Sequence, residues 1–176
     1  DKNIRITGIF FYGGHLYCTD TENHRIVVID EAGEITGAFG KRGSAPGEFN
    51  FPTHICVDSK NIYVTDALNF RVQIFDHAGV HVKSFGKNGR SGGDFSKPKG
   101  IAVDSKKRIF ITDVMFDNVQ VFDITGRFLS YFGEAGKGDE QFWMPNGIFI
   151  DETDNIYVAD TYNNRIKIYK VFTEKE

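Results

Sequence analysis

The stretch FGKNGRSGGDFSKPKGIAVD, residues 85–104, shows how the chain is organised, because the sequence repeats its pattern three times. Residues 39–58 read FGKRGSAPGEFNFPTHICVD, and residues 132–151 read FGEAGKGDEQFWMPNGIFID. Each copy runs from Phe-Gly through a glycine-rich loop to a Phe and a Pro, and ends in a short apolar segment closed by Asp. The copies start 46 and 47 residues apart. A period of about 40 to 50 residues is typical of propellers, solenoids and other arrays.

The composition fits one globular domain. The 176 residues carry a formal net charge of −3, which argues mildly against a nucleic-acid binder, although a net charge can hide a basic patch. No apolar run is long enough to span a membrane, and no signal peptide is recognised, so the compartment stays open. Cys18 and Cys56 take the place of small apolar residues in sister repeats and are expected to be buried thiols.

Each repeat contains four short apolar segments joined by tight turns, which predicts a four-stranded antiparallel meander. The segments are apolar on both faces, whereas a sheet with one wet face alternates cleanly. Sheets covered on both sides and repeated radially indicate a β-propeller, and an open stack of sandwiches is the competing architecture. We therefore predict an all-β propeller segment, residues 1–176, with four blades at about 4–40, 41–86, 87–133 and 134–172.

The repeats resemble NHL repeats. The resemblance rests on Pro-x-Gly-Ile at residues 98–101 and 145–148, on Asn-Ile-Tyr-Val-Ala-Asp at 155–160, and on Asn-Asn-Arg-Ile at 163–166. It covers nearly the whole chain and implies a six-bladed propeller, of which this chain would supply four blades. It also implies binding, since such propellers serve protein partners, RNA and, in divergent relatives, lyase or lactonase chemistry.

An Asp and an Arg stand five positions apart in three repeats, so each carboxylate is expected to oppose a guanidinium across a hairpin. The pairs are Asp20 with Arg25, Asp66 with Arg71, and Asp160 with Arg165. In the third repeat Asp113 faces Asn118 instead, which predicts a freer carboxylate. We interpret these residues as structural.

Candidate binding residues are those that depart from their sister repeats at loop positions. Large apolar residues replace polar ones, and such residues are candidate hot spots, although packing under a loop explains them as well. The candidates are Phe51, Phe70, Phe116, Trp143 and Tyr162 in loops, Lys97 in the basic loop, and His54. His54 replaces a glycine where the innermost strand begins, and is expected at the mouth of the tunnel.

These observations favour a non-catalytic scaffold that binds proteins or peptides through its loops, with no cofactor and no metal. The alternative is single-stranded RNA binding by the basic loops that carry Arg90 and Lys97. A metal-dependent lyase or lactonase at the tunnel mouth is the third reading; no repeated set of further ligands supports it.

The two ends of the chain predict an open propeller. The fourth repeat lacks its outer strand, and three residues before the first strand are too few to supply it. We therefore expect exposed apolar faces on the first and last blades, and association with another copy or a missing segment.

Overall fold

A computed structural model describes residues 4–170, which form fifteen strands in four antiparallel sheets. The first sheet contains β1 (Ile6–Tyr12), β2 (His15–Asp20), β3 (Arg25–Asp30) and β4 (Ile35–Phe39). The second contains β5 (Pro52–Val57), β6 (Ile62–Asp66), β7 (Arg71–Phe75) and β8 (His81–Phe85). The third contains β9 (Pro98–Val103), β10 (Ile109–Asp113), β11 (Asn118–Phe122) and β12 (Phe128–Phe132). The fourth contains β13 (Pro145–Ile150), β14 (Asn155–Asp160) and β15 (Arg165–Lys170).

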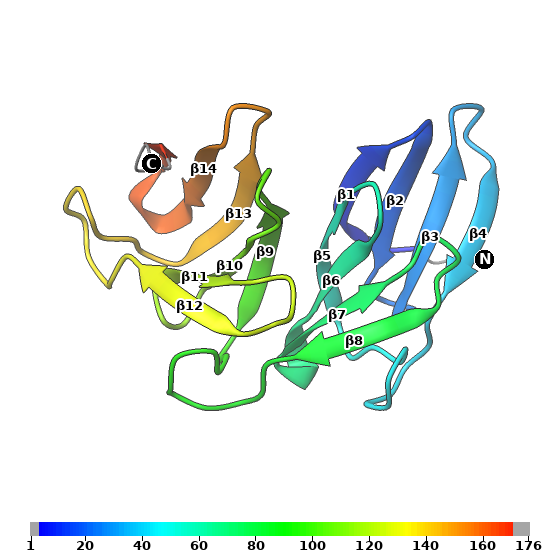
Figure 1. The fold of residues 1–176 in the computed structure, drawn as a ribbon, viewed down its shortest axis with the longest axis horizontal. Coiled ribbons are helices and arrows are strands. Elements are labelled where there is room, and N and C mark those ends of the chain that lie inside the picture. Colours follow the sequence, from blue (N-terminus) through cyan, green and yellow to red (C-terminus); the bar gives the residue numbers. More distant parts are fainter. Residues whose placement is uncertain (1–3, 171–176) are drawn as a thin grey trace.

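The sheets are arranged as propeller blades, which confirms the predicted fold class. Every strand pairs with its neighbours in sequence, so each sheet is a meander. The inner strands β1, β5, β9 and β13 contact one another in turn, and the first and last sheets lie at opposite sides of the molecule (Figure 1). In the described residues, no helix is long and apolar enough to cross a membrane.

Small and hydroxylated side chains bring the inner strands together. A Cβ on Gly8 would lie 2.5 Å from the Thr53 carbonyl oxygen, and one on Gly100 would lie 2.4 Å from that of Asn146. The hydroxyls of the threonines at one repeat position donate to the carbonyl of the next blade, at 3.0, 2.7 and 2.6 Å for Thr19, Thr65 and Thr112. In the first and third repeats a glycine therefore permits the close approach of the inner strands, while the second repeat has His54 at this position.

The Phe-Gly motif organises the core between blades. Phe49, Phe95 and Phe142, one from each inter-blade loop, are 0% exposed. Gly86 has a φ of +93°, and a Cβ there would lie 2.4 Å from the Phe95 ring. Glycine is thus needed at this position both for its backbone conformation and for the ring that packs over it.

The first and last blades each expose one apolar face, as predicted. On the first blade Ile9 and Phe11 are 62% and 61% exposed, and on the last Ile166 and Ile168 are 69% and 64% exposed. These faces are not packed on each other. In the described residues β15 is the outermost strand of a three-stranded sheet; the predicted end of this unit at residue 172 lies outside them.

Candidate binding face

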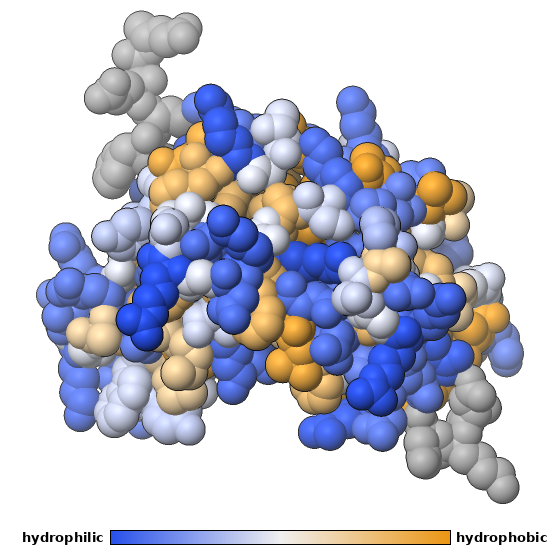
Figure 2. Space-filling model, turned by 90° about the horizontal axis from the view of Figure 1, so that it is seen from below, coloured by the Kyte–Doolittle hydropathy of each residue, from blue (hydrophilic) through white to orange (hydrophobic). Residues whose placement is uncertain are grey.

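One side of the propeller is formed by the loops that precede the inner strands and the turns that follow the second strands. We call it the loop face. The two sets of loops are joined by backbone hydrogen bonds, from Leu68 to Asn50 at 3.0 Å and from Tyr162 to Trp143 at 3.1 Å. Two of these turns are short 3-10 helices, η1 (Ala67–Asn69) and η2 (Thr161–Asn163). Seen from the side on which the loops after β4 and β8 lie, the surface shows apolar patches separated by hydrophilic groups (Figure 2).

A buried aspartate holds each part of this face in place. The Asp66 side chain is 0% exposed, and it accepts hydrogen bonds from the Asn50 N–H at 2.7 Å, Asn69 Nδ2 at 2.8 Å and Arg71 Nε at 2.8 Å. The Arg71 guanidinium also donates to the carbonyls of Ser44, Ala45 and Glu48. The aspartate and arginine thus clamp the inter-blade loop to the hairpin.

The predicted ion pairs of the first and fourth blades are also present. Arg25 Nε lies 3.0 Å from Asp20, and Arg165 Nε lies 2.7 Å from Asp160. Burial acts to raise the pKa of Asp160, but hydrogen bonds from Trp143, Asn163 and Arg165 outweigh burial and leave the pKa lowered. All three carboxylates are 0% exposed, so these are buried ion pairs rather than surface ones.

The prediction that Asp113 carries a freer carboxylate is wrong. Asp113 faces Asn118 as expected, but its side chain is fully buried. It accepts backbone hydrogen bonds from Ser96, Lys97 and Met115 at 2.7, 3.0 and 3.1 Å. Burial raises its pKa, against the effect of these donors. Backbone N–H groups therefore replace the missing guanidinium.

Trp143 and Tyr162 form an accessible aromatic pair on the loop face. They are 42% and 56% exposed, and their ring centroids lie 5.6 Å apart. Lys137 Nζ lies 5.1 Å from the Trp143 ring centroid. Two aromatic rings beside a cation make a rigid surface suited to apolar or aromatic groups of a partner.

Two exposed apolar residues of the loop face escaped the sequence analysis. Leu68 and Met115 are 50% and 58% exposed. Both stand two positions after the buried aspartate of their blade, as Tyr162 does, while the first blade has Glu22 there. Reading this one repeat position across all four copies would have found them.

The other aromatic loop candidates are less accessible. Phe70 is half-buried, packs against the core between the second and third blades, and has a φ of 54°. Phe51 is half-buried and donates its N–H to His24 Nδ1 at 3.0 Å. Phe116 is half-buried and lines a small pocket with Asn118. Lys97 is exposed, while its backbone is held by Asp113.

His54 lies on the inner side of the propeller, as the third residue of β5 rather than at its start. It lines a cavity of about 180 Å³ bounded by residues of β1, β5, β9 and β13. Burial, and to a smaller extent the charge of Lys99, lower the pKa of His54 to about 4. The imidazole is therefore neutral at neutral pH. Among residues 4–170, no group of three or more His, Cys, Asp or Glu side chains could hold a metal ion.

Acidic side chains of the inter-blade loops partly neutralise the lysines of the same loops. Lys41 Nζ lies 3.3 Å from Glu48, and Lys87 Nζ lies 3.9 Å from Asp94. Both lysines are well exposed, so these pairs are weak. They nonetheless reduce the positive potential that RNA would meet beside Lys97.

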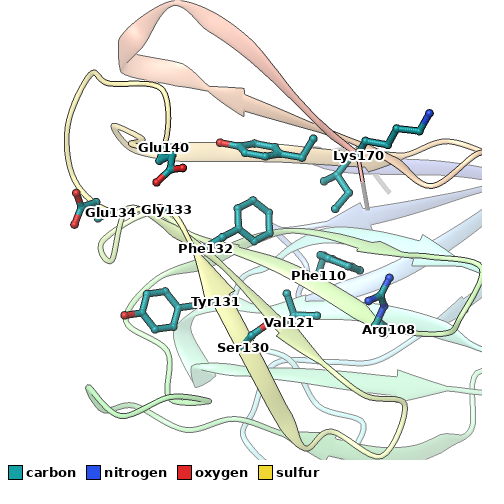
Figure 3. A pocket seen from close by; sticks show the side chains of 12 residues that line it. Arg108, Phe110, Val121, Ser130, Tyr131, Phe132, Gly133, Glu134, Glu140 and Lys170 are labelled. Carbon is teal, nitrogen blue, oxygen red and sulfur yellow. The ribbon is translucent and has the colours of Figure 1, made fainter. Parts of the chain in front are cut away.

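A cavity of about 690 Å³ lies between the third and fourth blades. Phe132 stands in it, with Arg108 and Lys170 toward one end and Glu134 and Glu140 toward the other (Figure 3). At the two preceding interfaces this place is closed by a turn of the outer hairpin, whose glycine packs on Phe39 or Phe85. The cavity thus lies where the outer hairpin turn of the next blade packs at the other two interfaces.

The sequence profile of a family described as 6-bladed beta-propeller matches residues 2–63, 55–115 and 104–175 of the chain. The matches overlap and together span almost all of it. Among curated proteins, none matches.

Solved structures share the fold at low identity. A streptogramin B lyase is 16% identical with a TM-score of 0.68, over 94% of this chain and 54% of that one. The RRP9 WD40 repeats are 12% identical with a TM-score of 0.68, over 97% and 52%. A Bacteroides thetaiotaomicron protein of unknown function is 21% identical with a TM-score of 0.70, over 94% and 47%. The chain thus spans about half the length of these proteins, and these similarities show the fold alone.

Proposed function

The chain belongs to the 6-bladed beta-propeller family, and from this premise we propose that it is a non-catalytic scaffold of the NHL type that binds a protein or peptide through its loop face. The observation that carries the proposal is the row of exposed apolar side chains on that face. It comprises Leu68, Met115, Trp143 and Tyr162. Large exposed apolar and aromatic residues on a rigid scaffold are typical of interaction sites.

Trp143 and Tyr162 are the expected anchors. Their rings lie against each other and their backbones are held by hydrogen bonds to Asp160 and between the two loops. A partner side chain placed on them therefore meets a preorganised surface, which limits the entropy lost on binding.

A selection from a displayed peptide library, followed by affinity measurement on purified variants, tests this proposal. Trp143→Ala and Tyr162→Ala are each expected to weaken a selected peptide by about 2 kcal/mol, roughly 30-fold. Val80→Ser is the control, because Val80 is an exposed apolar residue that lies outside the loop face, in the turn after β7. Circular dichroism verifies the fold of all three variants. Equal binding by the Trp143 variant and the control would reject the loop face as the site.

RNA binding is the second candidate, and one observation favours it. Lys97 is exposed on the loop face, and its charge, after burial, contributes to lowering the pKa of the neighbouring Lys99. Positive charges are thus concentrated at this loop. Affinity for a single-stranded RNA that falls steeply with salt would support this candidate, whereas a peptide complex with a shallow salt dependence would oppose it.

The exposed sheet faces favour a further association. Apolar side chains of the first and last blades are covered when blades flank them on both sides, and β15 is an edge strand within the part of the chain that the structure describes. We propose that these surfaces pack against further blades, either of the same protein or of another copy. Sedimentation of the 176-residue chain as a strict monomer at high concentration would contradict self-association.

A further inference from the structure

We propose that the third blade contains a binding pocket for the guanidinium group of an arginine carried by a peptide or protein partner. The pocket has a volume of about 280 Å³ and lies at the loop face. It is lined by Arg90, Ser91, Gly92, Phe116, Asn118, Gln120 and Tyr131. The inference rests on the proposed function, since the arginine would belong to the bound partner.

The position of this pocket is the first argument. Asn118 opposes Asp113 across the hairpin as Arg71 opposes Asp66. Ser91 stands where the second blade has Ala45, whose carbonyl accepts from Arg71 at 3.0 Å. The pocket therefore corresponds to the space that an arginine side chain occupies in the neighbouring repeat.

The fourth blade repeats the same arrangement. Arg165 Nη2 donates to the carbonyls of Gly138 and Gln141 at 2.7 and 3.0 Å. These two residues correspond to Ser91 and Asp94 of the third blade. The second and fourth blades thus share a set of loop carbonyls that accept from a guanidinium, and in the third blade Asn118 stands at the position of that arginine.

The second argument is an unpartnered acceptor on a residue that lines the pocket. Asn118 Oδ1 is buried and has no hydrogen-bond partner among the described residues. An unsatisfied buried acceptor costs about 1–3 kcal/mol, so a donor that reaches it is favoured. A guanidinium carries five N–H donors in a planar fork, which suits several oxygens at once better than an ammonium does.

A nearby negative charge and two aromatic rings also favour a guanidinium in this pocket. The Asp113 carboxylate is buried beside Asn118, and the donors it meets are backbone N–H groups rather than a cation. Phe116 and Tyr131 line the pocket and offer ring surfaces to a cation. Arg90 opposes binding, because it lines the same pocket and its positive charge repels the positively charged ligand. Ser44 and Lys137 are its sister residues.

Nuclear magnetic resonance titration of the 176-residue chain with Nα-acetyl-arginine methylamide tests the pocket without a peptide. We expect saturable shifts of the Asn118, Ser91 and Gly92 signals, with a Kd on the order of millimolar for so small a ligand. The neutral citrulline analogue is expected to bind at least about tenfold more weakly, because it lacks the charge. Absence of shifts, or equal binding of citrulline, overturns the proposal.

Two variants sharpen the test. Asn118→Arg fills the pocket with the chain's own guanidinium, so it should abolish probe binding and raise the melting temperature. Arg90→Ser should tighten binding severalfold. Probe binding that survives Asn118→Arg, or is lost in Arg90→Ser, contradicts the assignment. If the arginine probe does not bind while peptides still bind at Trp143, the arginine pocket is rejected and the proposed function of the loop face still stands.

Discussion

In the second blade Asp66 receives hydrogen bonds from three side chains, whereas in the third blade Asp113 receives them from backbone N–H groups. The side-chain donors to Asp66 are Asn69, Arg71 and Gln73. Their counterparts at the first two positions are Phe116 and Asn118. A buried carboxylate at one repeat position is thus stabilised by different hydrogen-bond donors in two blades of the same chain.

The backbone compensation begins in the neighbouring blade. His24 and Asp117 accept the N–H of Phe51 and Met144 from the next loop, at 3.0 and 2.6 Å. Phe70 occupies the same repeat position but has no acceptor, so the N–H of Lys97 turns to Asp113 instead. A change of one side chain in the second blade therefore helps to satisfy a carboxylate in the third.

The comparison predicts its largest effect for Arg71→Asn. This change places at position 71 the residue that the third blade has at 118, but it does not supply the additional backbone N–H donors that surround Asp113. The variant leaves the buried Asp66 without its cation, and we expect a loss of about 3 kcal/mol in the free energy of unfolding. Urea denaturation with an unchanged m-value measures it. Arg127→Asn is the control, because its pair with Asp123 is 76% exposed on the arginine side. Equal losses in both variants would show that burial of Asp66 does not matter.

The inner strands give a second contrast between the same blades, at His54 and Gly100. Folding lowers the pKa of His54 to about 4, chiefly by burial, so the unfolded chain binds this proton more readily. The stability linked to neutral His54 is therefore complete above the unfolded pKa of about 6.5 and is lost progressively as the pH falls toward 4.

The expected contribution is about 2 kcal/mol over that window, reduced from the full shift because the side chain is only half-buried. His54→Gln should flatten the pH dependence of urea stability between pH 6.5 and 4 relative to the unsubstituted chain. His15→Gln is the control, since His15 is in an exposed hydrogen bond with Gly13. Parallel pH profiles for His54→Gln and the unsubstituted chain would disprove the buried neutral state.

Much of the fold could be read from the sequence because the repeats carry it in side chains. The spacing of Phe-Gly, Pro and Asp fixed the phase of the strands, and the positions of Asp66 and Arg71 were sufficient to predict their pairing. The unpaired faces of the first and last blades followed from the same count of strands. Each of these features depends on residue type and spacing alone.

The binding face was only partly predictable, for two physical reasons. Backbone donors do not appear as side-chain patterns, so the environment of Asp113 was misjudged. Exposure depends on what lies above a residue, so Phe70, which packs on the core, looked like Tyr162, which does not. Leu68 and Met115 could have been predicted from the sequence, because they occupy the same repeat position as Tyr162.

The smallest effect is expected for Phe116→Asn, which moves the third blade toward the second. In the second blade Asn69 Nδ2 donates to Asp66 and to the Gly43 carbonyl, at 2.8 and 2.9 Å. Asparagine at 116 would regain such hydrogen bonds, each worth about 1 kcal/mol, and lose a comparable amount of half-buried apolar surface. The two terms nearly cancel, so urea denaturation should show a change within about 0.5 kcal/mol. A loss above about 1.5 kcal/mol would mean that Phe116 packs as a core residue, and Phe116 would then leave the candidate binding face.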